Sequence, residues 1–347
     1  MRIAVTGLNN IDSPGPGVPV IRGLRESNKF KTDIIGFIYD TLEPGPYMEE
    51  VANNNFIIPY PSAGLESLYQ RIEYINSKLP IDLIIPTLDS ELFGFIKLAP
   101  RFEKLGIKTY LPGIDQLNLR GKDKLFDFCK KNNFKAPTNI LANSIQDLYE
   151  IPSKLSYPVV IKGIFYDAYV VNNFEESVTA FNKIRFKWGL PIIVQEFISG
   201  DEYNVCALGD GTGKTIGAVP MKKLYITDKG KGWAGITLDD QELINLSNNI
   251  IEKLSWKSGI ELEFVKDKKS NEYYLLEINP RFPAWVYLAV AAGQNLPEAL
   301  VELSLGKDVE PFSNYEVGKI FIRYSWDLIT DIKRFEEFTV KGEINHG

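Results

Sequence analysis

Histidine and cysteine are scarce in this chain of 347 residues. The single histidine, His346, is the penultimate residue, which argues against a Ser-His-Asp triad or a histidine proton shuttle. The two cysteines, Cys129 and Cys206, lack the spacing of a metal site. The pair argues against a disulfide framework and favours a reducing compartment, so we expect a cytoplasmic protein.

Long apolar runs and an excess of basic residues are also missing. No apolar run approaches the length of a membrane span, and the stretch Met1–Gly7 is too short for the apolar part of a signal peptide. The formal net charge is -6, which argues against nucleic acid as an electrostatic partner. We therefore expect no membrane partner and no nucleic-acid partner.

The opening of the chain lacks a dinucleotide fingerprint but has the pattern of a parallel sheet. Residues 2–6 and 33–39 predict strands with a helix between them, and no Gly-x-Gly-x-x-Gly follows the first strand. A further apolar strand at 81–86 is followed by Asp89 and Glu91. These acids could hold a cationic substrate group, because parallel sheets bind ligands at strand ends, or Asp89 or Ser90 could cap the next helix.

A hairpin rich in acids is the most informative part of the sequence. Residues 259–265 and 273–279 alternate as strands around a polar turn, and antiparallel pairing sets Glu263 opposite Glu277 and Glu261 opposite Asn279. One face of this hairpin gathers the acids. The other face is expected to be apolar, with Leu262, Phe264, Leu276 and Ile278.

Crowded carboxylates repel one another unless a cation lies between them, and Mg²⁺ prefers oxygen ligands of this kind. Arg281, just past the second strand, could meet an anion that bridges such metals. The alternative is a solvated hairpin face. The restrictive run Glu277–Arg281 favours the metal interpretation.

Two further segments have features of a nucleotide site. Lys162 interrupts an apolar strand, and a buried lysine needs a counter-charge that a polyphosphate would supply. The extended segment 191–198 could offer a backbone N–H and C=O to an adenine edge. A basic, glycine-rich stretch at 221–235 has the composition of a mobile lid.

Five motifs, taken in order, resemble the ATP-grasp superfamily, in particular its branch related to the carbamoyl-phosphate synthetase large subunit and biotin carboxylase. They are Gly121-Lys122-Asp123-Lys124, Val159-Val160-Ile161-Lys162-Gly163, Gln195 to Tyr203, Leu262-Glu263-Phe264 and Glu277-Ile278-Asn279-Pro280-Arg281. The resemblance implies an α/β and α+β chain. A parallel-sheet pre-ATP-grasp domain would span 1–115, a small subdomain 116–190, a subdomain with the metal site 191–310, and a strand and tail 311–347.

The resemblance also implies roles for individual residues. Lys124, with Lys122 as a rival, and Lys162 would grip ATP phosphates. Gln195, Glu196, Phe197 and Ile198 would form the adenine hinge, and Glu202 would bind ribose. Glu263, Glu277 and Asn279 would hold two Mg²⁺ ions, with Mn²⁺ as a substitute. Arg281, Lys162 and Asn279 would be catalytic, and Lys222 or Lys223 would reach the terminal phosphate.

The run after Arg281 departs from the family pattern. Trp285 stands where small residues are usual, so we expect it to shape a different substrate site, with Asp89 and Glu91 as further substrate candidates. The implied activity is an ATP-dependent carboxylate–amine ligase that forms an acyl-phosphate and releases ADP. Carboxy-phosphate chemistry on bicarbonate and a non-catalytic ATP sensor are the alternatives. The implied partners are a small carboxylate and an amine, such as amino acids or short peptides, and homodimers are common in the family.

Overall fold

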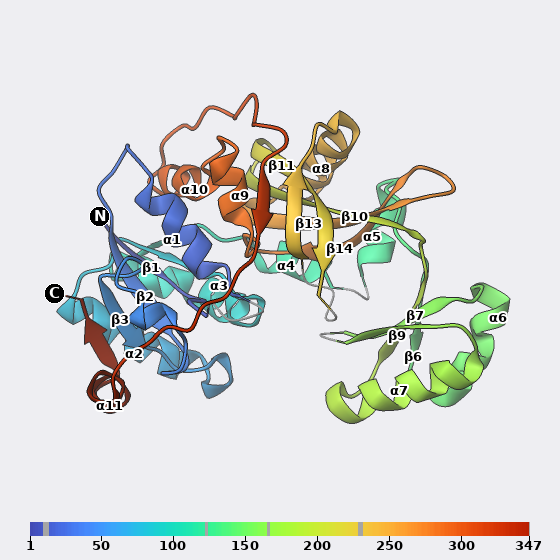
Figure 1. Cartoon of the computed structure of the whole chain (residues 1–347), viewed down its shortest axis with the longest axis horizontal. Coiled ribbons are helices and arrows are strands. Elements are labelled where there is room, and N and C mark those ends of the chain that lie inside the picture. The colour runs from blue at the N-terminus through green and yellow to red at the C-terminus, as the bar shows by residue number, and fades with distance from the viewer. Residues whose placement is uncertain (10–13, 122–123, 165–166, 228–231, 347) are drawn as a thin grey trace.

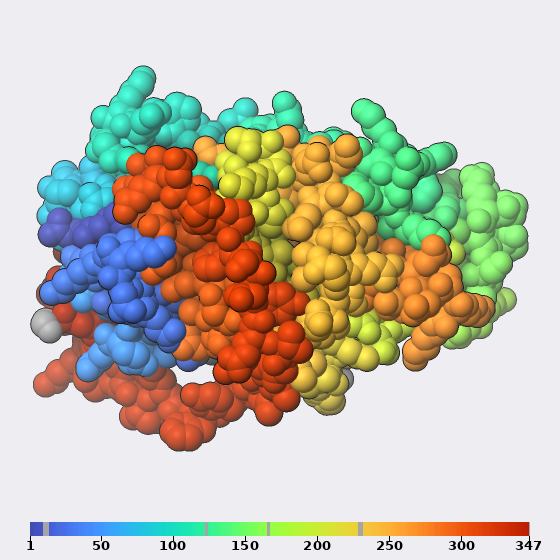
Figure 2. All heavy atoms as spheres, turned by 90° about the horizontal axis from the view of Figure 1, so that it is seen from above, coloured from blue at the N-terminus to red at the C-terminus, as the bar shows by residue number. Residues whose placement is uncertain are grey.

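The computed structural model describes residues 1–9, 14–121, 124–164, 167–227 and 232–346 and builds them around three β-sheets (Figure 1). None of the helices in these ranges is both long and apolar enough to cross a membrane. In the view from above, the orange and red C-terminal half of the chain lies between the blue N-terminal part and the yellow strands, and the green residues form the far end (Figure 2).

The N-terminal sheet is parallel, as the sequence predicts, apart from one strand. Its order is β16-β3-β2-β1-β4-β5, with β16 antiparallel to β3. The strands are β1 (Arg2–Val5), β2 (Asp33–Ile38), β3 (Asn54–Ile57), β4 (Leu83–Ile85), β5 (Lys108–Thr109) and β16 (Glu343–Asn345). The helices are α1 (Gly17–Arg25), α2 (Leu65–Lys78), α3 (Asp89–Lys104) and α11 (Ile332–Lys341), with 3-10 turns η1 (Gly45–Tyr47) and η2 (Pro61–Ala63). Through β16, the last described strand returns to the first sheet.

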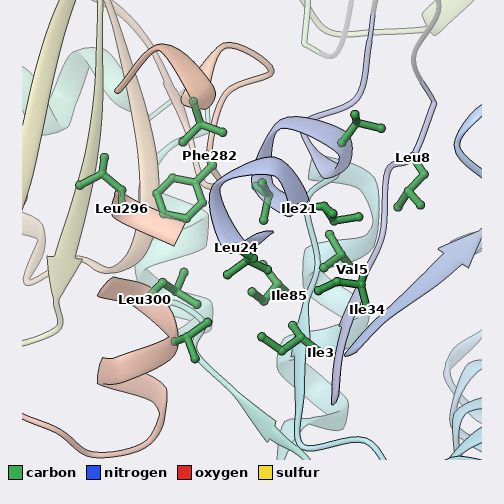
Figure 3. Packing of buried hydrophobic residues seen from close by; sticks show 14 of the residues in the cluster. Ile3, Val5, Leu8, Ile21, Leu24, Ile34, Ile85, Phe282, Leu296 and Leu300 are labelled. Carbon is green, nitrogen blue, oxygen red and sulfur yellow. The ribbon is translucent and has the colours of Figure 1, made fainter. Parts of the chain in front are cut away.

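Alternation along β1 divides the N-terminal core into two layers. Ala4 faces α2 and α3, whereas Ile3 and Val5 face α1 on the opposite side of the sheet. The second layer continues beyond the domain, because α1 also contacts α9 (Val286–Ala291) and α10 (Leu296–Ser304) of the C-terminal half. Figure 3 shows this shared core, in which Phe282 and Leu296 lie beside Ile21 and Leu24 of α1.

The smallest sheet has four antiparallel strands in the order β6-β9-β7-β8. They are β6 (Asn139–Ala142), β7 (Val159–Gly163), β8 (Ala168–Val171) and β9 (Ile192–Glu196), and α7 (Phe174–Trp188) covers one face (Figure 1). The short helices η3 (Ile145–Glu150) and α6 (Ile151–Lys154) complete it, and α4 (Ile114–Leu119) and α5 (Leu125–Lys131) precede it. Since β9 pairs here, the small sheet extends to Glu196 rather than ending near 190.

The third sheet is antiparallel and runs β14-β13-β10-β11-β12-β15. Its strands are β10 (Gly200–Asp210), β11 (Thr215–Ile226), β12 (Gly232–Thr237), β13 (Lys257–Asp267), β14 (Tyr273–Asn279) and β15 (Ile320–Ile322). Helix α8 (Gln241–Leu254) packs on one face, and α9 (Val286–Ala291) and α10 (Leu296–Ser304) belong to the core on the other. The acidic hairpin is therefore at one edge of this sheet.

The hairpin register predicted from the sequence is confirmed at the acids. Glu261 pairs with Asn279 and Glu263 with Glu277, but the register then shifts at a β-bulge, so that Phe264 pairs with Leu275. The expectation that Leu276 lies on the apolar face is wrong, because the extra residue turns Leu275 into the core instead.

Candidate functional site

The acids of the hairpin lie on the face of the sheet that is turned away from α8. Their alternating neighbours, Leu262 and Ile278, fill the core on the α8 side. The Asn279 amide donates to Glu263 Oε1 at 2.8 Å and to Glu261 Oε2 at 3.1 Å, tying the two strands together across the acidic face. The strand end thus combines carboxylates and an amide in one place.

Lys223 supplies a positive charge to this face from β11. Its ammonium lies 2.6 Å from Glu202 Oε2 and 3.2 Å from Glu263 Oε2, and its side chain is 7% exposed. Although burial acts in the opposite direction, Lys223, Arg281 and the Asn279 amide hold the pKa of Glu263 well below its usual value. The neighbouring Lys222 pairs with Asp201 at 2.6 Å, so of the two lysines Lys223 is the one that contacts the hairpin acids.

Glu261 accepts more hydrogen bonds than the sequence suggests. This buried carboxylate receives the Trp285 indole N–H at 2.7 Å, the Asn204 amide at 2.7 Å, and groups of Asn279 and Arg281. Because its donors come from β10, β14 and the segment after β14, Glu261 positions other site residues. The sequence placed Glu261 on the acidic face but indicated no role for it. Its donors Asn204 and Trp285 are 57 and 24 positions away in the chain, so no local sequence pattern reveals these hydrogen bonds.

Arg281 connects the hairpin with the N-terminal domain. Its Nη1 donates to Glu261 Oε2 at 3.0 Å, and its Nε donates to Asp89 Oδ2 at 3.1 Å. Burial lowers the pKa of this guanidinium, but Asp89 and then Glu261 outweigh it, so the pKa is raised above its ordinary value. Asp89, the first residue of α3, also lies 3.5 Å from Arg120. The acid proposed for a cationic substrate thus pairs with two arginines of the chain.

The other substrate candidates are buried. Trp285 is 7% exposed and packs beside Phe282 in the shared core, so in this structure it reaches the site through its hydrogen bond to Glu261. Glu91 is 1% exposed and accepts hydrogen bonds from the hydroxyls of Thr6 and Tyr39 and from backbone N–H groups. Burial raises the pKa of Glu91 to about 7. Its carboxylate is closed to a substrate in this conformation.

One cation near the hairpin was not singled out from the sequence. Arg323, directly after β15, donates from Nε to Gly232 O at 3.0 Å. Burial lowers the pKa of this guanidinium, and the charge of Glu261 acts in the opposite direction. A charged residue interrupting the strand-like run Ile320–Tyr324 was the available signal.

The residues proposed for ATP lie on the small sheet and along the chain that leaves it. On adjacent strands, Lys162 donates to Gln195 Oε1 at 2.9 Å, and both side chains are buried. The Glu196 N–H is already bonded to Thr138 O at 2.8 Å, which leaves Phe197 and Ile198 as the extended backbone after the sheet. Lys124 is exposed at the start of α5. Lys122, and Lys229 to Lys231 of the expected lid, are outside the described residues.

The residues on the acidic face fit a hard divalent cation. Glu263 and Glu277 are directly opposed, Asn279 adds an amide oxygen, and the face already accommodates the ammonium of Lys223. Across the described ranges, no three His, Cys, Asp or Glu side chains are grouped to hold a metal by themselves. A magnesium ion here would therefore need further ligands, and phosphate oxygens are the usual supplement.

Residues 190–321 match the family model described as "ATP-grasp in the biosynthetic pathway with Ter operon". Together with the sheet topology, this match identifies an ATP-grasp domain over residues 190–321, as the motifs predict.

Relatives in sequence are distant. The carbamoyl phosphate synthase large chain of Thermoanaerobacter sp. (strain X514) is 23% identical over 68% of this chain and 24% of its own length. The D-alanine–D-alanine ligase of Rickettsia typhi (strain ATCC VR-144 / Wilmington) is 28% identical over 43% of this chain and 50% of its own length. Each match thus covers half or less of the relative.

Solved structures share the fold at low sequence identity. The biotin carboxylase domain dimer of Hydrogenobacter thermophilus 2-oxoglutarate carboxylase, solved with MgADP and bicarbonate, has a TM-score of 0.71 at 16% identity, over 92% of this chain and 73% of that one. The L-amino acid ligase from Bacillus licheniformis has a TM-score of 0.66 at 16% identity, over 89% of this chain and 75% of that one. The mixed α/β fold predicted from the sequence is thereby confirmed.

Proposed function

We propose that this protein is an ATP-dependent carboxylate–amine ligase that activates a carboxylate as an acyl-phosphate and releases ADP. The observation that carries the proposal is the hairpin register, which opposes Glu263 to Glu277 and sets Asn279 and Arg281 at the same strand end. Ligases among the similar proteins, acting on D-alanine or L-amino acids by name, support this class.

In this proposal the residues of the chain divide between nucleotide and reacting groups. Lys162, Lys124 and Lys223 bind phosphate oxygens, Phe197 and Ile198 offer backbone groups to adenine, and Glu202 takes ribose once Lys223 turns to the phosphate. Glu263, Glu277 and Asn279 would hold two Mg²⁺ ions, which supply charge neutralisation during phosphoryl transfer. Mn²⁺ presents similar ligand demands and is expected to substitute.

Arg281 acts in both steps of the reaction. Its guanidinium stabilises the oxygens that gain charge when the carboxylate attacks phosphorus and when the amine displaces phosphate. The mechanism needs no nucleophilic side chain, which agrees with a chain whose single histidine is the penultimate residue. Excluding water by a closed segment over the site would protect the mixed anhydride.

The test is an ADP-release screen with Mg-ATP against pairs of amino acids, short peptides and bicarbonate, followed by mass spectrometry of the products. We expect ADP release that requires both an acid and an amine. Bicarbonate-dependent release without an amine would favour carboxy-phosphate chemistry, as in the carbamoyl phosphate synthase relatives. ATP binding without any ADP would favour a sensor.

The matched variant is Glu277→Gln, which keeps the side-chain shape and removes the charge. We expect loss of Mg-dependent ADP release with an unchanged unfolding midpoint, and surviving turnover would refute the metal assignment. A cytoplasmic location and a homodimer, the latter reported for the biotin carboxylase domain above, stay predictions for this chain. Light scattering after size exclusion tests the dimer.

A further inference from the structure

Asp89 is the point at which the N-terminal domain touches the proposed reacting centre. It lies 192 positions before Arg281 in the chain, yet its Oδ2 accepts from Arg281 Nε at 3.1 Å. Asp89 belongs to α3 and Arg281 follows β14, so the contact joins the parallel sheet's domain to the antiparallel sheet.

We propose that Asp89 is a positioning residue that orients the Arg281 guanidinium, so that the reacting site is complete only with the N-terminal domain in place. This inference rests on the proposed function, because it assigns Asp89 to the same reaction. It replaces the expectation that Asp89 binds a cationic substrate group directly.

The geometry of the guanidinium supports this role. The group is planar with donors in a rigid fork, so two acceptors on different edges, one at Nε and one at Nη1, set its plane. Asp89 holds Nε, and Glu261 holds Nη1 at 3.0 Å. Glu261 is itself fixed by Trp285 and Asn204, and the remaining nitrogen, Nη2, can then face an anion in a defined direction.

Asp89 is not needed for the helix on which it lies. The cap position of α3 is Leu88, whose N–H is taken by Glu91 Oε1 at 2.9 Å. Glu91 therefore satisfies the N–H of the cap residue, and no capping hydrogen bond of the Asp89 side chain is described that would compete with Arg281. Its second partner, Arg120 Nη1, is more distant at 3.5 Å. The shortest described contact of Asp89 is thus with Arg281.

Two cores hold the two ends of this ion pair in place: helix α3, which begins at Asp89, packs through Phe95 and Phe102 in the N-terminal core, and the Arg281 end belongs to the shared core. Phe282, next to Arg281, is 3% exposed and packs in the same cluster as residues of α1 and β1 (Figure 3). Gly259 makes room for that ring, because a Cβ there would lie 2.6 Å from Phe282 Cδ1. Since the backbones on either side are fixed by packing, the Asp89–Arg281 pair avoids much of the ordering cost of a surface salt bridge.

The experiment compares Asp89→Asn and Asp89→Glu in the full chain, with Glu66→Gln as the matched control. Glu66 pairs with Arg101 on the exposed surface of the same domain, away from the hairpin. For Asp89→Asn we expect kcat to fall by about 100-fold with ATP affinity unchanged, because a misoriented Arg281 guanidinium would stabilise the transition state less. Asp89→Glu, which keeps the charge, should recover part of that loss, and Glu66→Gln should behave as wild type.

A readout without turnover accompanies the kinetics: hydrogen–deuterium exchange of the peptide that contains Arg281. We expect faster exchange in Asp89→Asn and wild-type exchange in Glu66→Gln. If Asp89→Asn keeps wild-type kcat, or loses ATP binding and kcat together through unfolding, the positioning role is refuted. If the wild-type protein releases no ADP with any substrate pair, the proposed function fails, and unchanged exchange in Asp89→Asn would separately refute this inference.

Discussion

Two carboxylates, the buried Glu91 in the N-terminal domain and the partly buried Glu263 on the hairpin, have pKa values that are shifted in opposite directions. Glu91 is surrounded by hydroxyl and backbone donors, and burial raises its pKa to about 7. Glu263 is surrounded by Lys223, Arg281 and the Asn279 amide, which keep its pKa low despite burial. A carboxylate that accepts hydrogen bonds from neutral donors links neighbouring strands. A carboxylate that contacts cations keeps its negative charge.

The difference separates structural burial from a charged site. Glu91 joins β1, β2 and β4 through Thr6, Tyr39 and Thr87, and none of these partners is charged. Glu263 lies among cations that a metal ion or a phosphate could displace or share. Acidic residues at strand ends therefore differ in function according to the charge of their donors, and four experiments with five substitutions test this contrast.

The largest effect is expected for Lys223→Met. Removing the buried ammonium leaves the partly exposed Glu263 and Glu202 without their closest cation, and breaking one side of a fully buried ion pair, at about 3–5 kcal/mol, sets the upper bound of the loss. Urea denaturation should show this loss in metal-free buffer and partial recovery in excess Mg²⁺. An unchanged midpoint would contradict the importance of Lys223 as the counter-charge.

A smaller effect is expected from pH through Glu91. Because its folded pKa, about 7, exceeds the ordinary value of 4.5, the folded state holds a proton that the unfolded chain has lost between these values. Stability should therefore fall by about 3 kcal/mol as pH rises from roughly 4.5 to 7. Glu91→Gln should remove this component. Parallel urea titrations of the two proteins give the difference, and identical pH profiles would show that Glu91 is ionised in the fold.

A still smaller effect is expected for Trp285→Phe, which we compare with Trp256→Phe. The Trp285 indole donates to the Glu261 carboxylate, and the Trp256 indole donates to Gly259 O at 3.1 Å, a neutral acceptor. Hydrogen bonds to charged groups contribute about 1.5–3 kcal/mol and neutral ones about 0.5–1.5 kcal/mol. Trp285→Phe should therefore lower the unfolding free energy more than Trp256→Phe. The reverse order would contradict the claim that the charged acceptor contributes more than the neutral one.

The smallest effect is expected for Arg101→Gln. Its partner Glu66 is on the surface, and exposed ion pairs contribute little because water and salt screen them. Calorimetry should find an unchanged unfolding temperature. A clear decrease would mean that charge pairing stabilises this domain even where the groups are exposed.

Much of the site could be predicted where the evidence is local. Alternation within 259–265 and 273–279 fixed the pairing of Glu263 with Glu277 and of Glu261 with Asn279, because strand side chains repeat every two residues. The same reasoning missed the bulge that replaces Leu276 with Leu275 in the core. A bulge adds one residue on one strand, and the polar turn gives no sign of where it falls.

The sequence by itself determined the order of motifs, the parallel opening sheet and the acids of the hairpin, since each depends on neighbours within a few residues. Only the tertiary structure decided that Lys223 rather than Lys222 contacts Glu263, that Glu91 is buried, and that Asp89 holds Arg281. These outcomes depend on how distant strands and helices pack against one another, and contacts between residues almost two hundred positions apart leave no periodic trace in the chain.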